Sequence, residues 1–103
     1  MKSENAYIRY VVFLSNLPGK RVGEAEIRVH VQFLQDLDTK LLLELCGPFR
    51  DGLGGMIILK NIESLELAQQ IAAADPFVAK GYKAAEVRVM DLSCEENNHL
   101  GMG

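Results

Sequence analysis

The chain has 103 residues, which suffices for one small domain but not for two independent cores. Hydrophobic residues make up 49% of the chain and charged residues 24%, a balance that excludes intrinsic disorder and a disulfide scaffold. The net charge of −3 provides no positive field to attract phosphates. We therefore expect no nucleic-acid partner and no anionic membrane as a partner.

The two cysteines, Cys46 and Cys94, are far apart and form no CxxC motif. This spacing argues against a zinc ribbon, an iron–sulfur cluster and thioredoxin-like chemistry, so we expect two reduced thiols. The polar segment 1–7 lacks the apolar core of a secretory signal, and no apolar run is long enough to span a membrane. A cytoplasmic protein is the expectation.

In chain order, apolar runs and turn residues predict four strands and two helices. The run 7–14 is rich in β-branched and aromatic residues and ends at a Pro-Gly turn, so it is typical of a strand. Segment 24–37 has apolar residues at helical spacing, and Ser64 is a candidate N-cap for a helix that Pro76 would end. The remaining predicted strands are 41–49, 55–59 and 85–89.

The order βαββαβ predicts an α+β, ferredoxin-like antiparallel sheet with both helices on one face. The first strand, however, offers apolar side chains on both sides, with Val11 and Phe13 opposite Tyr10 and Val12. In the second strand we expect Leu43 and Leu45 to share a face. Two helices cannot cover both sides, so we expect a homodimer in which the open sheet faces pack together.

We expect a single domain over residues 1–92. The segment 93–103 is polar and contains several glycines, so we expect it to form a mobile tail.

His30 is the polar exception within the first helix. Counted at 100° per residue, it lies in the apolar stripe formed by Ile27, Val31, Phe33, Leu34 and Leu37. A buried imidazole needs a partner, because an unpaired polar group costs about 1–3 kcal/mol. Two interpretations stay open: a core histidine bonded to a backbone carbonyl, or a general base whose orientation a carboxylate fixes.

Asp75 is the carboxylate that could meet it. This residue ends the second helix, where the helix dipole disfavours negative charge, so its position requires a reason. It could cap a short turn that begins with Pro76, or it could reach His30 from the neighbouring helix. One aspartate can serve both purposes.

Other residues are candidates for a binding pocket. Glycines flank the predicted hairpin, where they permit unusual backbone angles or close approach, but no phosphate-binding loop is present. We expect Gly47 to allow close approach, Ser15 to act as a polar anchor, and Phe49, Met56 and Phe77 to form walls. For each of these residues the plain alternative is a turn or core position.

Several of these motifs resemble the YciI-like family. They are Gly47-Pro48-Phe49, the glycine-rich run 51–59, Asp75-Pro76-Phe77-Val78 with Gly81, and Glu86-Val87, so that the likeness spans about 7–89. The resemblance implies a small dimeric α+β barrel related to muconolactone isomerase. It also implies a His/Asp centre, which falls on His30 and Asp75 of this chain.

The characterised activity associated with that family is dehydrochlorination of a chlorinated hydroxyhydroquinone in aromatic degradation. This activity suits the residues present, because a base that removes a proton sets up loss of chloride without a metal or organic cofactor. The resemblance thus implies a cofactor-independent lyase with a small aromatic substrate. A proton-shift isomerase and a non-catalytic ligand-binding module remain the alternatives.

Overall fold

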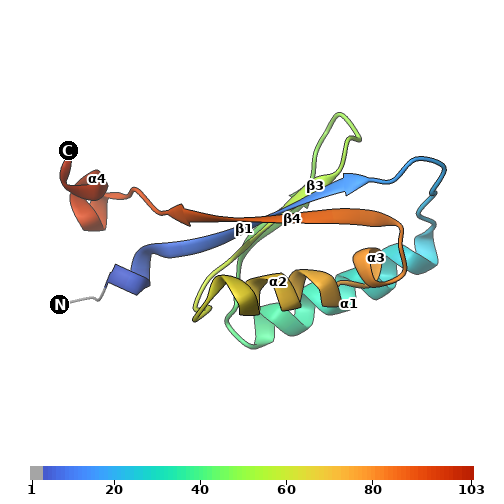
Figure 1. The fold of residues 1–103 in the computed structure, drawn as a ribbon, viewed down its shortest axis with the longest axis horizontal. Helices are drawn as coiled ribbons and strands as arrows, with labels where there is room; N and C mark the ends of the chain where they lie inside the picture. Colours follow the sequence, from blue (N-terminus) through green and yellow to red (C-terminus); the bar gives the residue numbers. More distant parts are fainter. Residues whose placement is uncertain (1–3) are drawn as a thin grey trace.

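A computed structural model describes residues 4–103 of the chain. Figure 1 shows a sheet with helices along one side of it. In chain order the elements are η1 (Glu4–Tyr7), β1 (Ile8–Asn16), α1 (Glu24–Thr39), β2 (Leu43–Pro48), β3 (Gly55–Leu59), α2 (Leu65–Ala74), α3 (Pro76–Ala79), β4 (Lys83–Asp91), η2 (Glu95–Asn97) and α4 (Asn98–Gly101). The predicted strands and helices are all present, and no end is shifted by more than two residues.

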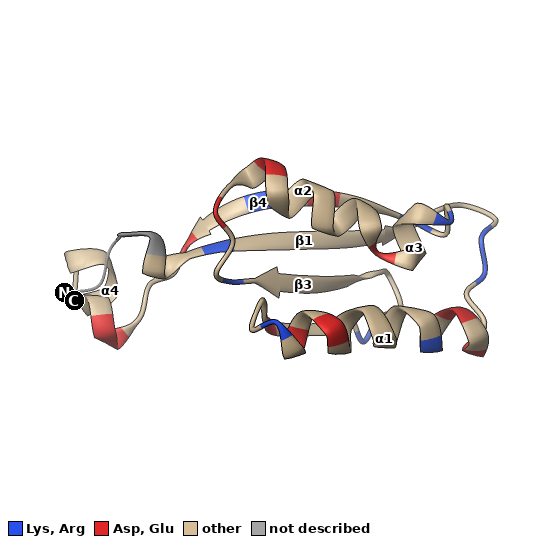
Figure 2. Ribbon diagram, turned by 90° about the horizontal axis from the view of Figure 1, so that it is seen from below, with Lys and Arg blue, Asp and Glu red and all other residues tan. Residues whose placement is uncertain are grey.

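The strands form one antiparallel sheet in the order β2-β3-β1-β4. This is the ferredoxin-like α+β arrangement, so the predicted fold class is confirmed. Helix α1 packs against β2, and α2 packs against β4. Figure 2 shows these two helices along opposite sides of the same sheet face. The short helix α3 continues from α2 and contacts α1, which brings the two helical segments together at one end of the sheet.

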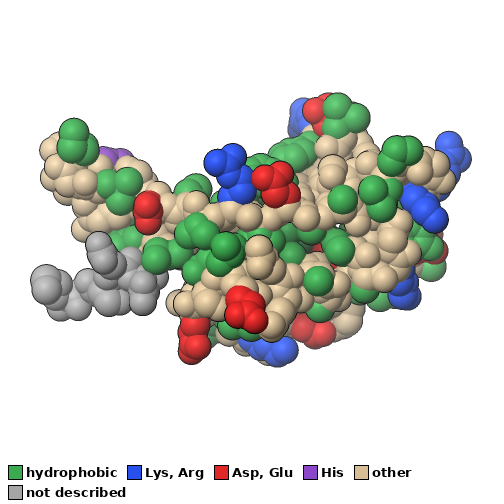
Figure 3. All heavy atoms as spheres, viewed as in Figure 1, with side chains coloured by type: hydrophobic (Ala, Val, Ile, Leu, Met, Phe, Trp, Pro, Cys, Tyr) green, Lys and Arg blue, Asp and Glu red, His purple; other side chains and the backbone are tan. Residues whose placement is uncertain are grey.

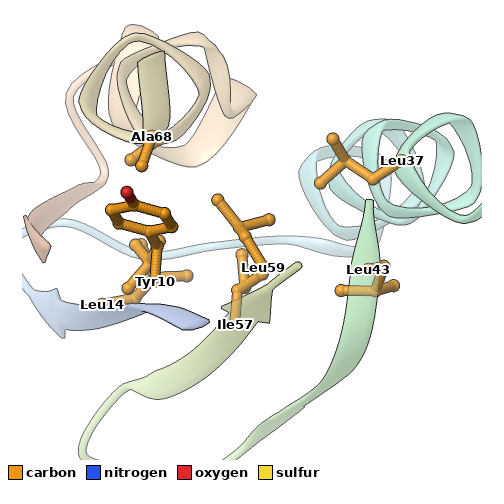
Figure 4. Close-up of a cluster of buried hydrophobic side chains, with 9 residues drawn as sticks. Tyr10, Leu14, Leu37, Leu43, Ile57, Leu59 and Ala68 are labelled. Carbon is orange, nitrogen blue, oxygen red and sulfur yellow. The ribbon is translucent and has the colours of Figure 1, made fainter. Parts of the chain in front are cut away.

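The core lies between the sheet and the helices, as Figure 4 shows. Tyr10 of β1 points toward Ala68 of α2, and Leu37 of α1 lies over Leu43 of β2. Leu59 and Ala68 are completely buried. A small residue at position 68 lets α2 approach the sheet closely, which fixes where its C-terminal end lies.

A β-bulge separates two leucines that we expected on one face. Leu43 pairs with Leu59 and is buried, whereas Leu45 pairs with Ile58 and is 51% exposed. The register shifts between these two leucines, so one extra residue breaks the alternation of the strand. Glu44 occupies that position and accepts a hydrogen bond from Arg9 at 3.0 Å. The expectation for Leu45 was therefore wrong.

The apolar stripe of α1 is narrower than predicted. Leu37 is buried, and Phe33 and Leu34 pack against the core, but Val31 is 41% exposed. The helix lies over the β2 edge of the sheet, so only part of its apolar surface meets the strands. Val31 was thus wrongly assigned to the packed face.

The sheet face opposite the helices carries apolar side chains. Val11 is buried between its neighbours, while Phe13 and Leu45 are 38% and 51% exposed. By strand register, Met56 and Ile58 lie on the same side. No element within residues 4–103 covers this face. On the face that Figure 3 draws, acidic and basic side chains are scattered among apolar ones, with no large region of one sign.

After β4 the chain continues away from the sheet, beside η1, as Figure 1 shows. The segment expected to be a mobile tail contains the helical turns η2 and α4, and its mobility stays a prediction. Residues 1–3 of the expected domain lie outside the described residues. Among the described residues, no helix is both long and apolar enough to cross a membrane.

Candidate functional site

His30 lies on the inner side of α1, near the contact between α1 and α3. Ile27 and Leu34 stand one turn before and one turn after it on the same helix face. The side chain of His30 is only 12% exposed, so its ring nitrogens need partners within the protein.

Asp75 supplies one of those partners. Its Oδ1 lies 2.8 Å from Nδ1 of His30, although the two residues are 45 positions apart in the chain. The aspartate ends α2 because Pro76 follows it, and it also caps α3. In that second role Oδ1 accepts a hydrogen bond from the backbone N–H of Phe77 at 2.9 Å. One carboxylate oxygen thus serves as helix cap and as partner of the imidazole.

Phe77 holds the imidazole from a second direction. Its ring stacks on the ring of His30 with centroids 4.0 Å apart and planes 11° apart. Because the backbone N–H of Phe77 also binds Asp75, this residue fixes both members of the pair. The His30 ring therefore has one preferred orientation, set by a hydrogen bond at its edge and an aromatic ring at its face.

The pairing has a direct chemical consequence. Asp75 is 1% exposed, and its Oδ2 accepts no hydrogen bond from the described residues. With Nδ1–H of His30 donating to Oδ1, the other ring nitrogen, Nε2, keeps its lone pair. No donor of another described residue forms a hydrogen bond to that lone pair. The pair can therefore accept a proton at Nε2, and the carboxylate stabilises the resulting cation.

A cavity of about 260 Å³ lies beside His30. Cavities of about 150 Å³ in other proteins bind benzene, so this one has room for a single substituted ring. Its walls come from β1, α1, the β2–β3 hairpin, α3 and the start of β4. The residues that line it are mostly apolar: Leu14, Val22, Ile27, His30, Leu34, Cys46, Gly47, Pro48, Gly54, Gly55, Met56, Ile57, Phe77 and Lys83.

Three of the five residues predicted for the pocket lie at this cavity. Gly47, Met56 and Phe77 line it, together with His30. Ser15 and Phe49 are not among its lining residues, and both are exposed. Ser15 pairs with Ala84 in the β1–β4 ladder, and Phe49 follows β2 at the start of the hairpin turn. The structure does not bring these two to the cavity.

Lys83 lines the cavity, and we did not anticipate it from the sequence. It is the first residue of β4 and pairs in register with Asn16, the last residue of β1. Its Nζ donates a hydrogen bond to Oδ1 of Asn16 at 2.5 Å and lies 5.3 Å from the centre of the Phe77 ring. Only the register of strands far apart in sequence brings this lysine to the cavity, so no local motif could indicate it.

Cys46 also lines the cavity, from β2. Burial, and secondly the negative charge of Asp38, raise the pKa of its thiol above the ordinary value. A thiol in this state is a weak nucleophile at neutral pH. No group of three or more His, Cys, Asp or Glu side chains within residues 4–103 is arranged to hold a metal ion.

The fold and this site define an α+β domain of the ferredoxin-like type with a histidine–aspartate pair at an apolar cavity. Residues 8–93 match the YCII-related domain family. The uncharacterized protein YjpA of Bacillus subtilis (strain 168) is 32% identical over 83 residues, which cover 81% of this chain and 96% of YjpA. The chain therefore belongs to the YCII-related domain family.

A solved structure shares the fold. It is the 5-chloro-2-hydroxyhydroquinone dehydrochlorinase TftG from Burkholderia phenoliruptrix AC1100, in complex with 2,5-dihydroxybenzoquinone. The TM-score is 0.61 at 19% sequence identity, and the match covers 80% of this chain and 90% of that one. At this identity the likeness establishes a common architecture.

Proposed function

We propose that this chain is a cofactor-independent lyase that eliminates HCl from a chlorinated, hydroxylated aromatic ring. The observation that carries the proposal is the 2.8 Å contact between Nδ1 of His30 and Oδ1 of Asp75 at the wall of an apolar cavity. An imidazole oriented in this way is a suitable general base. Such a base is worth about 10²–10⁴-fold in rate when it is positioned against the proton it removes.

The proposed reaction needs only proton transfers. Nε2 of His30 takes the proton of a ring hydroxyl, and the ring carbon that carries chlorine takes up a proton. Chloride then leaves as a second hydroxyl loses its proton, so the carbon–chlorine bond breaks and the ring becomes a hydroxyquinone. HCl is the only by-product, and no oxidant is consumed. Asp75 stabilises the cationic imidazole during each transfer.

Two further observations support a small aromatic substrate. The cavity volume of about 260 Å³ suits one ring, and Leu34, Ile57 and Phe77 provide apolar walls. The structural neighbour TftG acts, by its name, on a chlorinated hydroxyhydroquinone, and its structure holds 2,5-dihydroxybenzoquinone. A common fold with a protein of that activity makes the same class of substrate the first to test.

The test is incubation of the purified protein with 5-chloro-2-hydroxyhydroquinone under nitrogen. Chloride is followed with an ion-selective electrode, and the quinone by its ultraviolet and visible absorbance. We expect both signals to rise together, and we expect His30→Ala to lower the rate about 10²-fold or more. His99→Ala is the matched control, because the second histidine lies in the tail and contacts Ser93 instead of the cavity.

Each alternative gives a different result. Consumption of a lactone or dienol without chloride release favours a proton-shift isomerase that uses the same pair. Binding without any turnover favours a ligand-binding module, in which Asp75 only satisfies a buried imidazole. Unchanged chloride release by His30→Ala would remove the proposed mechanism.

We also propose that the enzyme works as a homodimer joined through its open sheet faces. The exposed apolar side chains Phe13 and Leu45, beside Met56 and Ile58, support this arrangement, because a second copy would bury them. The cytoplasm is the proposed location, and the two free cysteines agree with a reducing compartment.

A further inference from the structure

Among the described residues that line the cavity, Lys83 is the only lysine, and none is an arginine. No carboxylate within residues 4–103 pairs with it. Its one hydrogen bond goes to Oδ1 of Asn16, a neutral amide. The remaining two donors of the ammonium group therefore stay available, and its charge is not neutralised.

The position of this charge is built into the fold. Nδ2 of Asn16 donates a hydrogen bond at 2.8 Å to the carbonyl oxygen of Gly52, in the β2–β3 turn. Asn16 is thereby held with its oxygen toward Lys83, and the ring of Phe77 lies 5.3 Å from Nζ on another side. Figure 2 shows basic residues at this end of the molecule, where α3 leads into β4. A long and flexible side chain is thus held at one place, beside the ring that stacks on His30.

An isolated cation at an apolar wall discriminates between ligands. A neutral ring gains little from it, whereas an anionic oxygen gains a charge-assisted hydrogen bond in a site with little water. The protein as a whole carries a net charge of −3, so its overall field repels anions. Any preference for an anion in this cavity must therefore come from a local group.

We infer that Lys83 is a specificity-determining residue that makes the cavity select planar aromatic anions, with the ligand's negatively charged oxygen at Nζ. Carboxylates, phenolates and ionised hydroxyquinones share this chemistry. The inference deepens the proposed function and rests on it for the reaction that takes place. In this arrangement the substrate ring binds as an anion, with His30 at one side and Lys83 at another.

The test compares two ligands that differ in charge and little in shape, 4-nitrobenzoate and 4-nitrobenzamide. Dissociation constants are measured by calorimetric titration at one pH and low ionic strength. We expect the wild-type protein to bind the anion about tenfold more tightly than the amide. Lys83→Met, which keeps the apolar stem, is expected to abolish that preference, and Lys83→Arg to retain it.

Lys80→Met is the matched control. It removes the same charge from the same end of the molecule, but Lys80 is exposed and does not line the cavity. We expect it to leave the preference unchanged. Equal binding of both ligands by the wild-type protein, binding of neither at millimolar concentration, or an equal loss in Lys80→Met and Lys83→Met would each overturn the inference.

Measurement in the His30→Ala variant separates this inference from the proposed function. Anion binding does not use the base, so we expect the preference to persist in that variant. If the preference persists but no chlorinated hydroquinone releases chloride, the proposed reaction fails and the inference stands. If Lys83→Met releases chloride with an unchanged KM and kcat, the inference fails and the proposed reaction stands.

Discussion

One oxygen atom of Asp75 meets two requirements. It caps α3 through the backbone N–H of Phe77, and it binds the imidazole of His30. The carboxylate lies at the C-terminal end of α2, where the helix dipole opposes it, so these two donors must offset that cost together with the cost of burial. The structural and the catalytic interpretations of Asp75 are therefore compatible, because the same geometry serves both.

Substitution of Asp75 by asparagine separates the two roles. The amide oxygen can still accept the hydrogen bond from Phe77, so we expect the variant to fold. The negative charge that stabilises a cationic His30 is lost, so we expect chloride release to fall about 10²-fold or more. Circular dichroism checks the fold, and the chloride electrode measures the rate.

Asp51→Asn is the control for this substitution. Asp51 also accepts a backbone hydrogen bond two residues ahead, from Leu53 at 2.8 Å, but it lies in the exposed hairpin turn. We expect its rate to match the wild type. Equal rates in Asp75→Asn and the wild type would show that the carboxylate contributes nothing to the reaction.

Cys46 gives a prediction for pH dependence. Because burial and the charge of Asp38 raise the pKa of its thiol, the thiolate forms only at higher pH than in a free cysteine. In a Cys94→Ser variant, where Cys46 is the single thiol, we expect the pH midpoint for alkylation by iodoacetamide to lie above that of free cysteine. A midpoint at or below the free value, measured by mass spectrometry, would contradict a raised pKa of this thiol.

At the scale of elements, the β2–β3 hairpin closes the cavity against the end of β1. Gly54 makes this approach possible: its φ of +99° disfavours other residues, and a Cβ there would lie 2.0 Å from the carbonyl oxygen of Leu14. Gly52, in the same turn, also has a positive φ, of +78°, but a Cβ there would meet nothing within 4 Å. The two glycines have similar backbone angles, but only Gly54 lies in close contact with the backbone of β1.

Alanine substitutions at the two glycines should therefore have unequal costs. We expect Gly52→Ala to lower the free energy of unfolding by about 1 kcal/mol, through backbone strain alone. Gly54→Ala must also move the hairpin, so we expect a loss of about 2 kcal/mol or more and weaker ligand binding. Urea titrations measure both. Equal losses would mean that the hairpin does not depend on the close contact with β1.

The elements themselves could be predicted from local patterns, but their exact contacts could not. Asp75-Pro76 indicated the corner between α2 and α3, and the helical spacing of α1 indicated its inward face. The sequence gives no sign of the bulge after Leu43, because an inserted residue can be recognised only from the pairing of the two strands. Lys83 was missed for a related reason, because only its pairing with Asn16 in the sheet brings it to the cavity.

At the scale of the whole molecule, the uncovered sheet face is the largest unexplained feature of the single chain. Helices cover one side of the sheet, and the side that carries Phe13 and Leu45 has no cover within the described residues. A small domain gains stability by burying such a face, and stable interfaces bury roughly 1,200–2,000 Å². The proposed homodimer accounts for it.

Leu45→Glu tests the dimer. A charge within the proposed sheet interface loses its hydration on association, so we expect a shift from dimer to monomer at micromolar concentration. Leu65→Glu is the control, because Leu65 is 40% exposed at the start of α2, on the helical side. Sedimentation equilibrium gives the mass of each variant. A wild-type protein that is already monomeric at this concentration would contradict the proposal.

The measurement that tests the central claim most directly is chemical rescue of His30→Ala. Removal of the imidazole leaves a space against the ring of Phe77, on which a free imidazole can stack as the native side chain does. If His30 is the general base, chloride release by this variant falls about 10²-fold or more, and added imidazole restores part of it while leaving Asp75→Asn unaffected. Wild-type rates in His30→Ala without imidazole would contradict the claim that this histidine moves the proton.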